Sequence, residues 1–149
     1  MERCGRHRAQ LDVFMIPLTQ PLTHSVMASS FADPADVRAF RRCKSAGGTD
    51  RECFRVGDNG IGAWGDDTTG SVPMCALPPE DWAAFPAPRG GTRIRVTGNG
   101  RMVVCELRDT MPHRRFIKNG AGIDLNPAAC LALGLTPPVM YPVVWSLEP

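Results

Sequence analysis

The sequence predicts a small, mainly β barrel built from short strands, tight turns and a few helical turns. The chain of 149 residues contains 15 Gly and 14 Pro, and both residue types break helices and concentrate in turns. Short apolar alternations recur in the second half, whereas the strand–helix–strand rhythm of a doubly wound sheet does not occur. A single domain of this length buries a core of its own.

The first 26 residues differ in character from the rest of the chain. They begin with basic residues and continue with a short apolar run, VFMIPL, at 13–18. A secretory signal needs an uninterrupted apolar stretch of roughly 7–15 residues, so we interpret this segment as a poor match to a signal peptide. We expect an N-terminal extension without defined structure over 1–26 and one barrel domain over 27–149.

The domain begins with a clear helix signal. Asp33 is a suitable cap, Pro34 suits the first helical position, and the pair Gly47-Gly48 ends the pattern, which predicts a helix over 34–45. Residues 54–75 come next, with glycines at 57, 60, 62, 65 and 70. They exclude a helix and predict a long, shaped loop of the kind that carries function.

The second half gives the most regular pattern. Alternating residues over 92–97 and 101–109 flank the turn Gly98-Asn99-Gly100, which predicts a hairpin. Asn126 caps a helix over 127–133 that Gly134 ends. We also expect a single helical turn at 78–82 and a last strand over 139–147, where Pro142 indicates an edge or a bend.

The six cysteines form no C-x-x-C pair, so a zinc knuckle is not expected. Cys105 and Cys130 lie in apolar patterns and are expected in the core. Cys43 and Cys53 flank a Gly-rich turn and would bridge in an oxidising setting, but reduced thiols in a cytoplasm are the interpretation we favour.

Charge and motifs exclude several function classes. The formal net charge is +2, too small to attract nucleic acid or acidic lipid. No apolar run approaches the ~18–20 residues of a membrane span. Neither a P-loop nor a dinucleotide fingerprint is present. We expect a monomer with no cofactor, no metal, no nucleic-acid partner and no membrane span.

Two segments carry a family resemblance. VVCELRDTMP (103–112) and GAGIDLNPAACLALGL (120–135) resemble the double-psi β-barrel family of rare lipoprotein A, the expansins, barwin-like proteins and the three-aspartate domain of membrane-bound lytic transglycosylase A. Weaker matches lie at 62–65 and 74–77. The resemblance implies a six-stranded double-psi barrel with one or two short helices.

The resemblance also implies action on peptidoglycan or plant-wall polysaccharide through acidic residues. The family's working positions match Asp109 and Asp124, whereas the His that rare lipoprotein A carries near Met74 or Cys75 is absent here. Lytic cleavage needs a carboxylic acid that protonates the leaving oxygen, and its pKa must be raised. The structural alternative is that Asp124 binds backbone amides ahead of the helix and Asp109 stabilises the turn after it.

Residues near these aspartates are candidate substrate contacts. Trp64 would stack on a sugar ring, and His113 would hydrogen-bond a sugar, although an exposed loop histidine is the simpler interpretation. Asp66, Asp67 and Thr68 lie in the Gly-rich loop, where aspartates usually form Asx turns.

The leading hypothesis is a lytic-transglycosylase-like protein that cleaves wall glycan with an aspartate acid/base. The alternatives are a non-catalytic, expansin-like wall-binding or wall-loosening module and a barwin-like structural or inhibitor module. We expect action at the cell envelope or outside the cell. The domain layout suggests a phage or prophage protein, made in the cytoplasm and released by lysis or carried in a virion.

Overall fold

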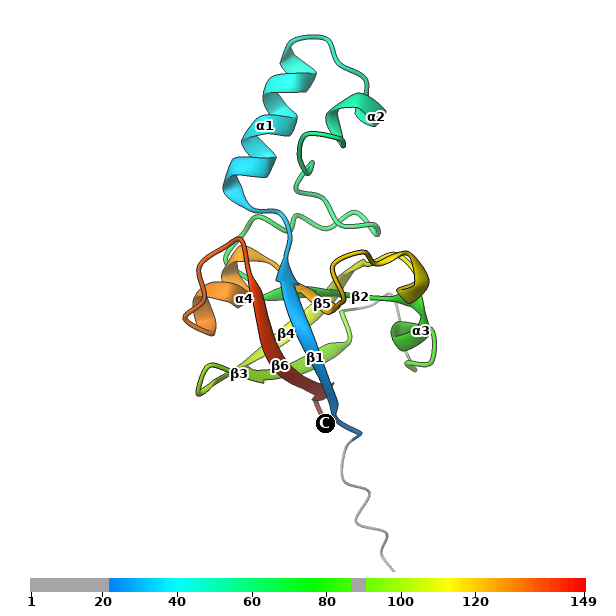
Figure 1. Cartoon of the computed structure of the whole chain (residues 1–149), viewed down its shortest axis with the longest axis vertical. Helices are drawn as coiled ribbons and strands as arrows, with labels where there is room; N and C mark the ends of the chain where they lie inside the picture. The colour runs from blue at the N-terminus through cyan, green and yellow to red at the C-terminus, as the bar shows by residue number, and fades with distance from the viewer. Residues whose placement is uncertain (1–21, 87–90) are drawn as a thin grey trace, which may run out of the picture.

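A computed structural model describes residues 22–86 and 91–149. Six strands close into a barrel in the order β1-β5-β2-β4-β3-β6, and Figure 1 shows β1 and β6 crossing its front. The strands are β1 (His24–Ser30), β2 (Met74–Leu77), β3 (Arg93–Gly98), β4 (Arg101–Thr110), β5 (Ala121–Leu125) and β6 (Met140–Leu147).

Both parallel and antiparallel pairs build the barrel. β1 runs parallel to β5 and β2 runs parallel to β4, while the remaining four pairs are antiparallel. The expected hairpin is present as β3 and β4, with Gly98 paired to Arg101. The predicted mainly β, six-stranded double-psi barrel is therefore confirmed.

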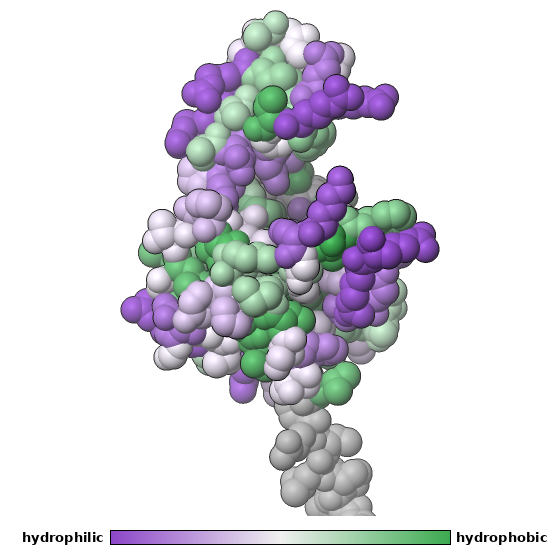
Figure 2. All heavy atoms as spheres, in the orientation of Figure 1, coloured by the Kyte–Doolittle hydropathy of each residue, from purple (hydrophilic) through white to green (hydrophobic). Residues whose placement is uncertain are grey.

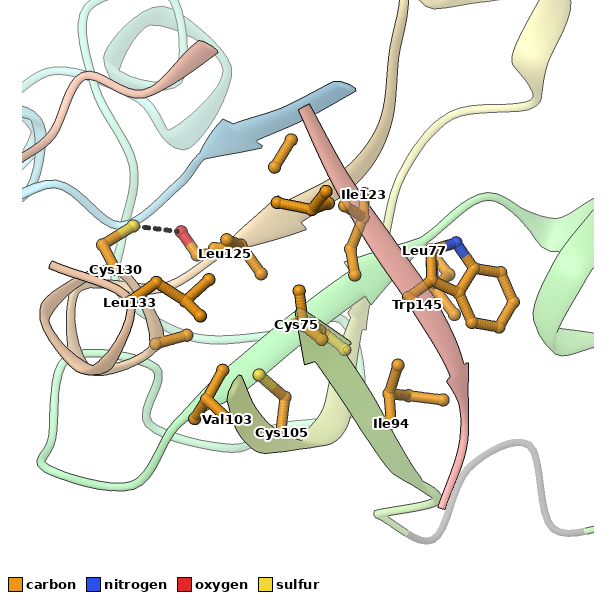
Figure 3. Close-up of a cluster of buried hydrophobic side chains, with 14 of the residues drawn as sticks. Cys75, Leu77, Ile94, Val103, Cys105, Ile123, Leu125, Cys130, Leu133 and Trp145 are labelled. Carbon is orange, nitrogen blue, oxygen red and sulfur yellow. Dashed lines mark hydrogen bonds between the residues drawn. The ribbon is translucent and has the colours of Figure 1, made fainter. Parts of the chain in front are cut away.

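Apolar side chains fill the barrel because alternate residues of each strand point inward. Figure 3 shows β2, β3, β4, β5 and β6 contributing to this core, with α4 (Pro127–Ala132) packed at one end. Cys105 and Cys130 are fully buried, as the sequence predicts, and Cys75 joins them in the core. The Sγ of Cys130 donates to the carbonyl of Leu125 at 3.7 Å.

The helices exceed the expected one or two. Besides α4 there are α1 (Pro34–Ser45), α2 (Asp50–Cys53), α3 (Pro79–Trp82) and the 3-10 turn η2 (Arg114–Phe116). The four-residue α2 is too short to show an apolar period. Its start is marked only by Thr49, whose Oγ1 accepts from the Glu52 N–H at 3.2 Å.

The helices α1 and α2 form an arm that extends away from the barrel (Figure 1). A disulfide joins Cys43 to Cys53, so the expectation of reduced thiols at this pair is wrong. A Cβ added at Gly48 would lie 2.6 Å from the Cys43 sulfur and 2.7 Å from the Cys53 sulfur. Only glycine leaves room for the bridge at this turn.

The strand β1 is the main element that the sequence pattern missed. It begins at His24, three residues before the expected domain start at Met27, and pairs with both β5 and β6. Of the extension expected over 1–26, residues 1–21 lie outside the described residues, whereas β1 already begins at His24. Among the residues that the structure does describe, none of the helices has the length and apolar character that a membrane crossing requires.

Removing the residues before Met27 should destabilise the barrel. His24 stacks on Trp145 with ring centroids 3.9 Å apart, Val26 packs against the core, and residues 24–26 pair with β6. Their loss should cost at least about 2 kcal/mol of unfolding free energy. A chain that begins at Met27 should therefore unfold at lower urea concentration than one that begins at Leu22, and equal midpoints would contradict this role of β1.

Candidate functional site

The two predicted aspartates flank the same residue of β2. Ala76 pairs with Asp109 of β4 on one side and with Asp124 of β5 on the other, and Asp124 pairs in turn with Ser29 of β1. Directly paired residues share one face of a sheet. We call Ser29, Asp124, Ala76 and Asp109 the aspartate row.

The aspartate row lies on the outer face of the barrel. The neighbours of Ala76 in β2, Cys75 and Leu77, point into the core, while Ala76 belongs to a separate small cluster with Met111 and Ala121. A row of this kind brings residues from four strands together without placing charges in the core. The prediction that the barrel brings Asp109 and Asp124 together thus agrees with the strand register.

Asp124 has the properties of a proton donor. Burial raises its pKa from 3.8 to about 6, and the charges of Asp109, Asp33 and Asp58 also act to raise it. The hydroxyl of Ser29 donates to its Oδ1, which favours the carboxylate but is outweighed by burial. The side chain also lines a pocket of about 270 Å³ beside the segment 111–119.

Asp109 is held by the long Gly-rich loop. Its Oδ1 accepts the N–H of Ala63 at 2.8 Å and that of Thr110 at 2.8 Å. These bonds lower its pKa, but burial outweighs them and the net pKa is raised. A Cβ added at Gly62 would lie 2.2 Å from the Arg108 carbonyl oxygen, so glycine is what allows the loop to reach this aspartate.

Two other candidates in this loop are engaged with their neighbours. Trp64 packs edge-on against Trp82 at 5.4 Å between centroids and contacts the core, so it offers only part of its ring to a ligand. Asp66 lies 3.7 Å from the guanidinium of Arg108. Both side chains therefore have partners inside the protein.

Asp67 and Thr68 also have structural roles in this loop. The Oδ1 of Asp67 accepts the N–H of Thr69 at 2.8 Å and its hydroxyl at 2.6 Å, and these bonds lower the pKa of Asp67. Thr68 is 1% exposed. In this conformation Asp67 forms the turn expected of an aspartate among glycines, and Thr68 is covered.

His113 lies just beyond the end of β4 and takes part in a group of polar contacts. Its Nδ1 lies 2.8 Å from Oε1 of Glu80, and the next residue, Arg114, forms an ion pair with the buried Asp81. These contacts join η2 to α3. These contacts fix the position of the segment that borders the Asp124 pocket. The His113 side chain itself is exposed to solvent.

Two residues of the site were not foreseen. Ser29 was missed because HSVMASS (24–30) lacks the alternation of a half-buried strand. Asn126 was expected only as a helix cap, yet its Oδ1 accepts the N–H groups of Met74 and Ala129, and its Nδ2 donates to the carbonyls of Thr68 and Val72. Its complete burial would have been the signal, and sequence alone does not show it.

The site holds carboxylates, a hydroxyl and backbone N–H groups. Within residues 22–86 and 91–149, no three His, Cys, Asp or Glu side chains are placed to hold a metal ion. The chemistry that these groups support is proton transfer, with two carboxyl groups of raised pKa on one row and one of them open to a pocket.

Comparison with solved structures supports the fold. The chain is similar to the Streptomyces papain inhibitor (SPI), with a TM-score of 0.52 and 22% sequence identity over 90% of this chain and 99% of that one. At this identity the likeness shows a shared barrel fold. No protein-family model matches the chain, and a search of curated proteins found no match.

Proposed function

We propose that the protein cleaves wall glycan by acid–base chemistry at the aspartate row. The observation that carries this is Asp124, a carboxyl open to a pocket whose pKa is raised to about 6. Below that pH it holds a proton that it can transfer to a glycosidic oxygen as the carbon–oxygen bond breaks. The resulting carboxylate then accepts the proton of the attacking hydroxyl.

Asp109 supports this reaction from the other side of Ala76. Its negative charge raises the pKa of Asp124, and the N–H groups of Ala63 and Thr110 fix its orientation. In lytic cleavage the attacking hydroxyl belongs to the sugar itself, so a single carboxyl serves as acid and then as base. The resemblance of the two aspartate motifs to wall-active barrels supports glycan as the substrate.

The test is incubation with purified peptidoglycan and mass analysis for anhydro-sugar products. Asp124→Asn should reduce the rate by at least about 100-fold, because an amide cannot donate and recover the proton. The rate of the unmodified chain should fall as the pH rises above about 6, where Asp124 ionises.

Asp50→Asn is the matched control, because it removes the same charge from α2 of the arm, where the Asp50 side chain is 72% exposed, and it should leave the rate unchanged. If the unmodified chain binds peptidoglycan but releases no product, the protein is a non-catalytic, expansin-like wall-binding or wall-loosening module.

A second candidate is a barwin-like module that binds a protein. The similarity in fold to an inhibitor of papain supports this candidate. Adding increasing amounts of the protein to papain and measuring peptide hydrolysis would test it. Stoichiometric inhibition that Asp124→Asn leaves intact would favour this function over glycan cleavage.

We propose that either function is exercised at the cell envelope or outside the cell. The Cys43–Cys53 disulfide supports this location, because such bridges persist in oxidising compartments and are rare in the cytosol.

A further inference from the structure

Three hollows lie in succession on the outer face of the barrel. The first, of about 580 Å³, crosses β3, β6 and β1, and the second, of about 390 Å³, lies between β1 and β5. The third is the Asp124 pocket of about 270 Å³. The first and second share Ser25, Val26 and Met27, and the second and third share Ile117. We call this succession the outer groove.

The floor of the outer groove is apolar. Figure 2 shows hydrophobic surface where Figure 1 draws β1 and β6. Val144, which lines the first hollow, is 38% exposed. A Cβ at Gly122 would meet the Val26 side chain at 2.6 Å, so Val26 lies over this glycine and forms the floor between β1 and β5. Burying such a surface under a ligand is favourable.

Closure of the barrel restricts what can occupy this groove. Every strand beside it is paired on both sides, so an extended peptide has no free strand edge to bind with its backbone. The occupant must instead cover the floor with apolar faces of its own. Sugar rings present such faces of C–H groups along a chain.

Cations line the second and third hollows of the groove. Arg114 lines the second hollow and Lys118 lines the third. Arg114 forms an ion pair with Asp81, yet 54% of its side chain stays exposed. A guanidinium at this place can also meet a carboxylate of a bound chain.

We propose that the outer groove binds an extended, carboxylate-bearing glycan strand on one side of the glycosidic bond whose oxygen Asp124 protonates. This inference rests on the proposed function and adds the length and chemistry of the substrate. Sugars in the Asp124 pocket supply the reacting bond, while those over β1 and β6 add affinity. Affinity should therefore rise with strand length until the groove is filled.

The test measures binding of peptide-free peptidoglycan strands of four and eight sugars, which carry free carboxylates. The full chain with Asp124→Asn is used, so that strands are not cleaved during calorimetry. We expect the eight-sugar strand to bind at least about tenfold more tightly than the four-sugar strand. Adding Val144→Glu places a charge on the apolar floor and should reduce this gain below about threefold, with four-sugar binding unchanged.

Leu131→Glu is the matched control, because it adds the same charge at a residue that is 78% exposed on α4 and lines none of the three hollows. The gain with length should survive in this variant. The proposal that the groove binds the strand would be overturned if the gain in affinity with strand length also survived Val144→Glu, or if four-sugar strands bound as tightly as longer ones. Either result would leave the proposed function standing. If no strand is bound and none is cleaved by the unmodified chain, both proposals fail.

Discussion

Replacing Asn126 with alanine should lower the free energy of unfolding by about 3–5 kcal/mol, a large part of the total stability of a domain. The side chain is completely buried and makes four hydrogen bonds, which join the start of β2, the loop 68–72 and the first turn of α4. Alanine would leave buried N–H and carbonyl groups without partners, and each such group costs about 1–3 kcal/mol.

Urea unfolding of the full chain measures this effect. Asn119→Ala is the control, since Asn119 is exposed and accepts one backbone N–H at 3.0 Å, so its loss should cost about 1 kcal/mol or less. Asn126→Asp keeps both accepted bonds but places a buried carboxylate against the carbonyl oxygens of Thr68 and Val72, so it should destabilise the protein about as strongly as alanine does. A small effect of Asn126→Ala would show that β2 and α4 are held together in another way.

Asp124→Asn should stabilise the protein at neutral pH. The pKa of Asp124 is raised from 3.8 to about 6 in the folded chain, so between these pH values the folded state keeps a proton that the unfolded chain has released. Stability therefore falls as the pH rises from about 4 to 6, by roughly 3 kcal/mol, and this loss persists at neutral pH. Asparagine does not ionise, so the Asp124→Asn chain does not undergo this loss of stability.

The measurement compares urea unfolding of the two chains at pH 4 and pH 7.5. The difference should be near zero at pH 4 and favour Asp124→Asn at pH 7.5. Asp67→Asn should act in the opposite direction at pH 7.5, because the pKa of Asp67 is lowered by its bonds to Thr69. Equal stability of Asp124→Asn and the unmodified chain at both pH values would show that Asp124 titrates normally.

The sequence predicted the elements whose local signals are strong. The hairpin of β3 and β4 has alternation and a Gly-Asn-Gly turn, and α1 and α4 have Pro at the first helical position, so their bounds came within a residue or two. The strand β1 has no such signal. Its position is determined by pairing with β5 and β6, which are distant in sequence.

The candidate site divides in the same way. The motifs around Asp109 and Asp124 identify both aspartates, but motifs do not show that Ala76 lies between them or that Ser29 completes the row. The disulfide was misjudged because cysteine spacing does not reveal the compartment. The contacts of Thr68 and Asp67 depend on the path of the Gly-rich loop over 54–75, which glycines permit but do not specify.

The position of β1 between β5 and β6 has a consequence for how the chain folds. Its partners are the last two strands described, so β1 must wait until nearly all of the sequence has been synthesised before it finds both neighbours. When segments that are distant in sequence pair, the chain loses loop-closure entropy before the stabilising contacts form. This loss raises the barrier and slows folding. Ser29 and Asp124 meet only in that step, so the aspartate row assembles when the barrel closes, and nascent, incomplete chains lack it.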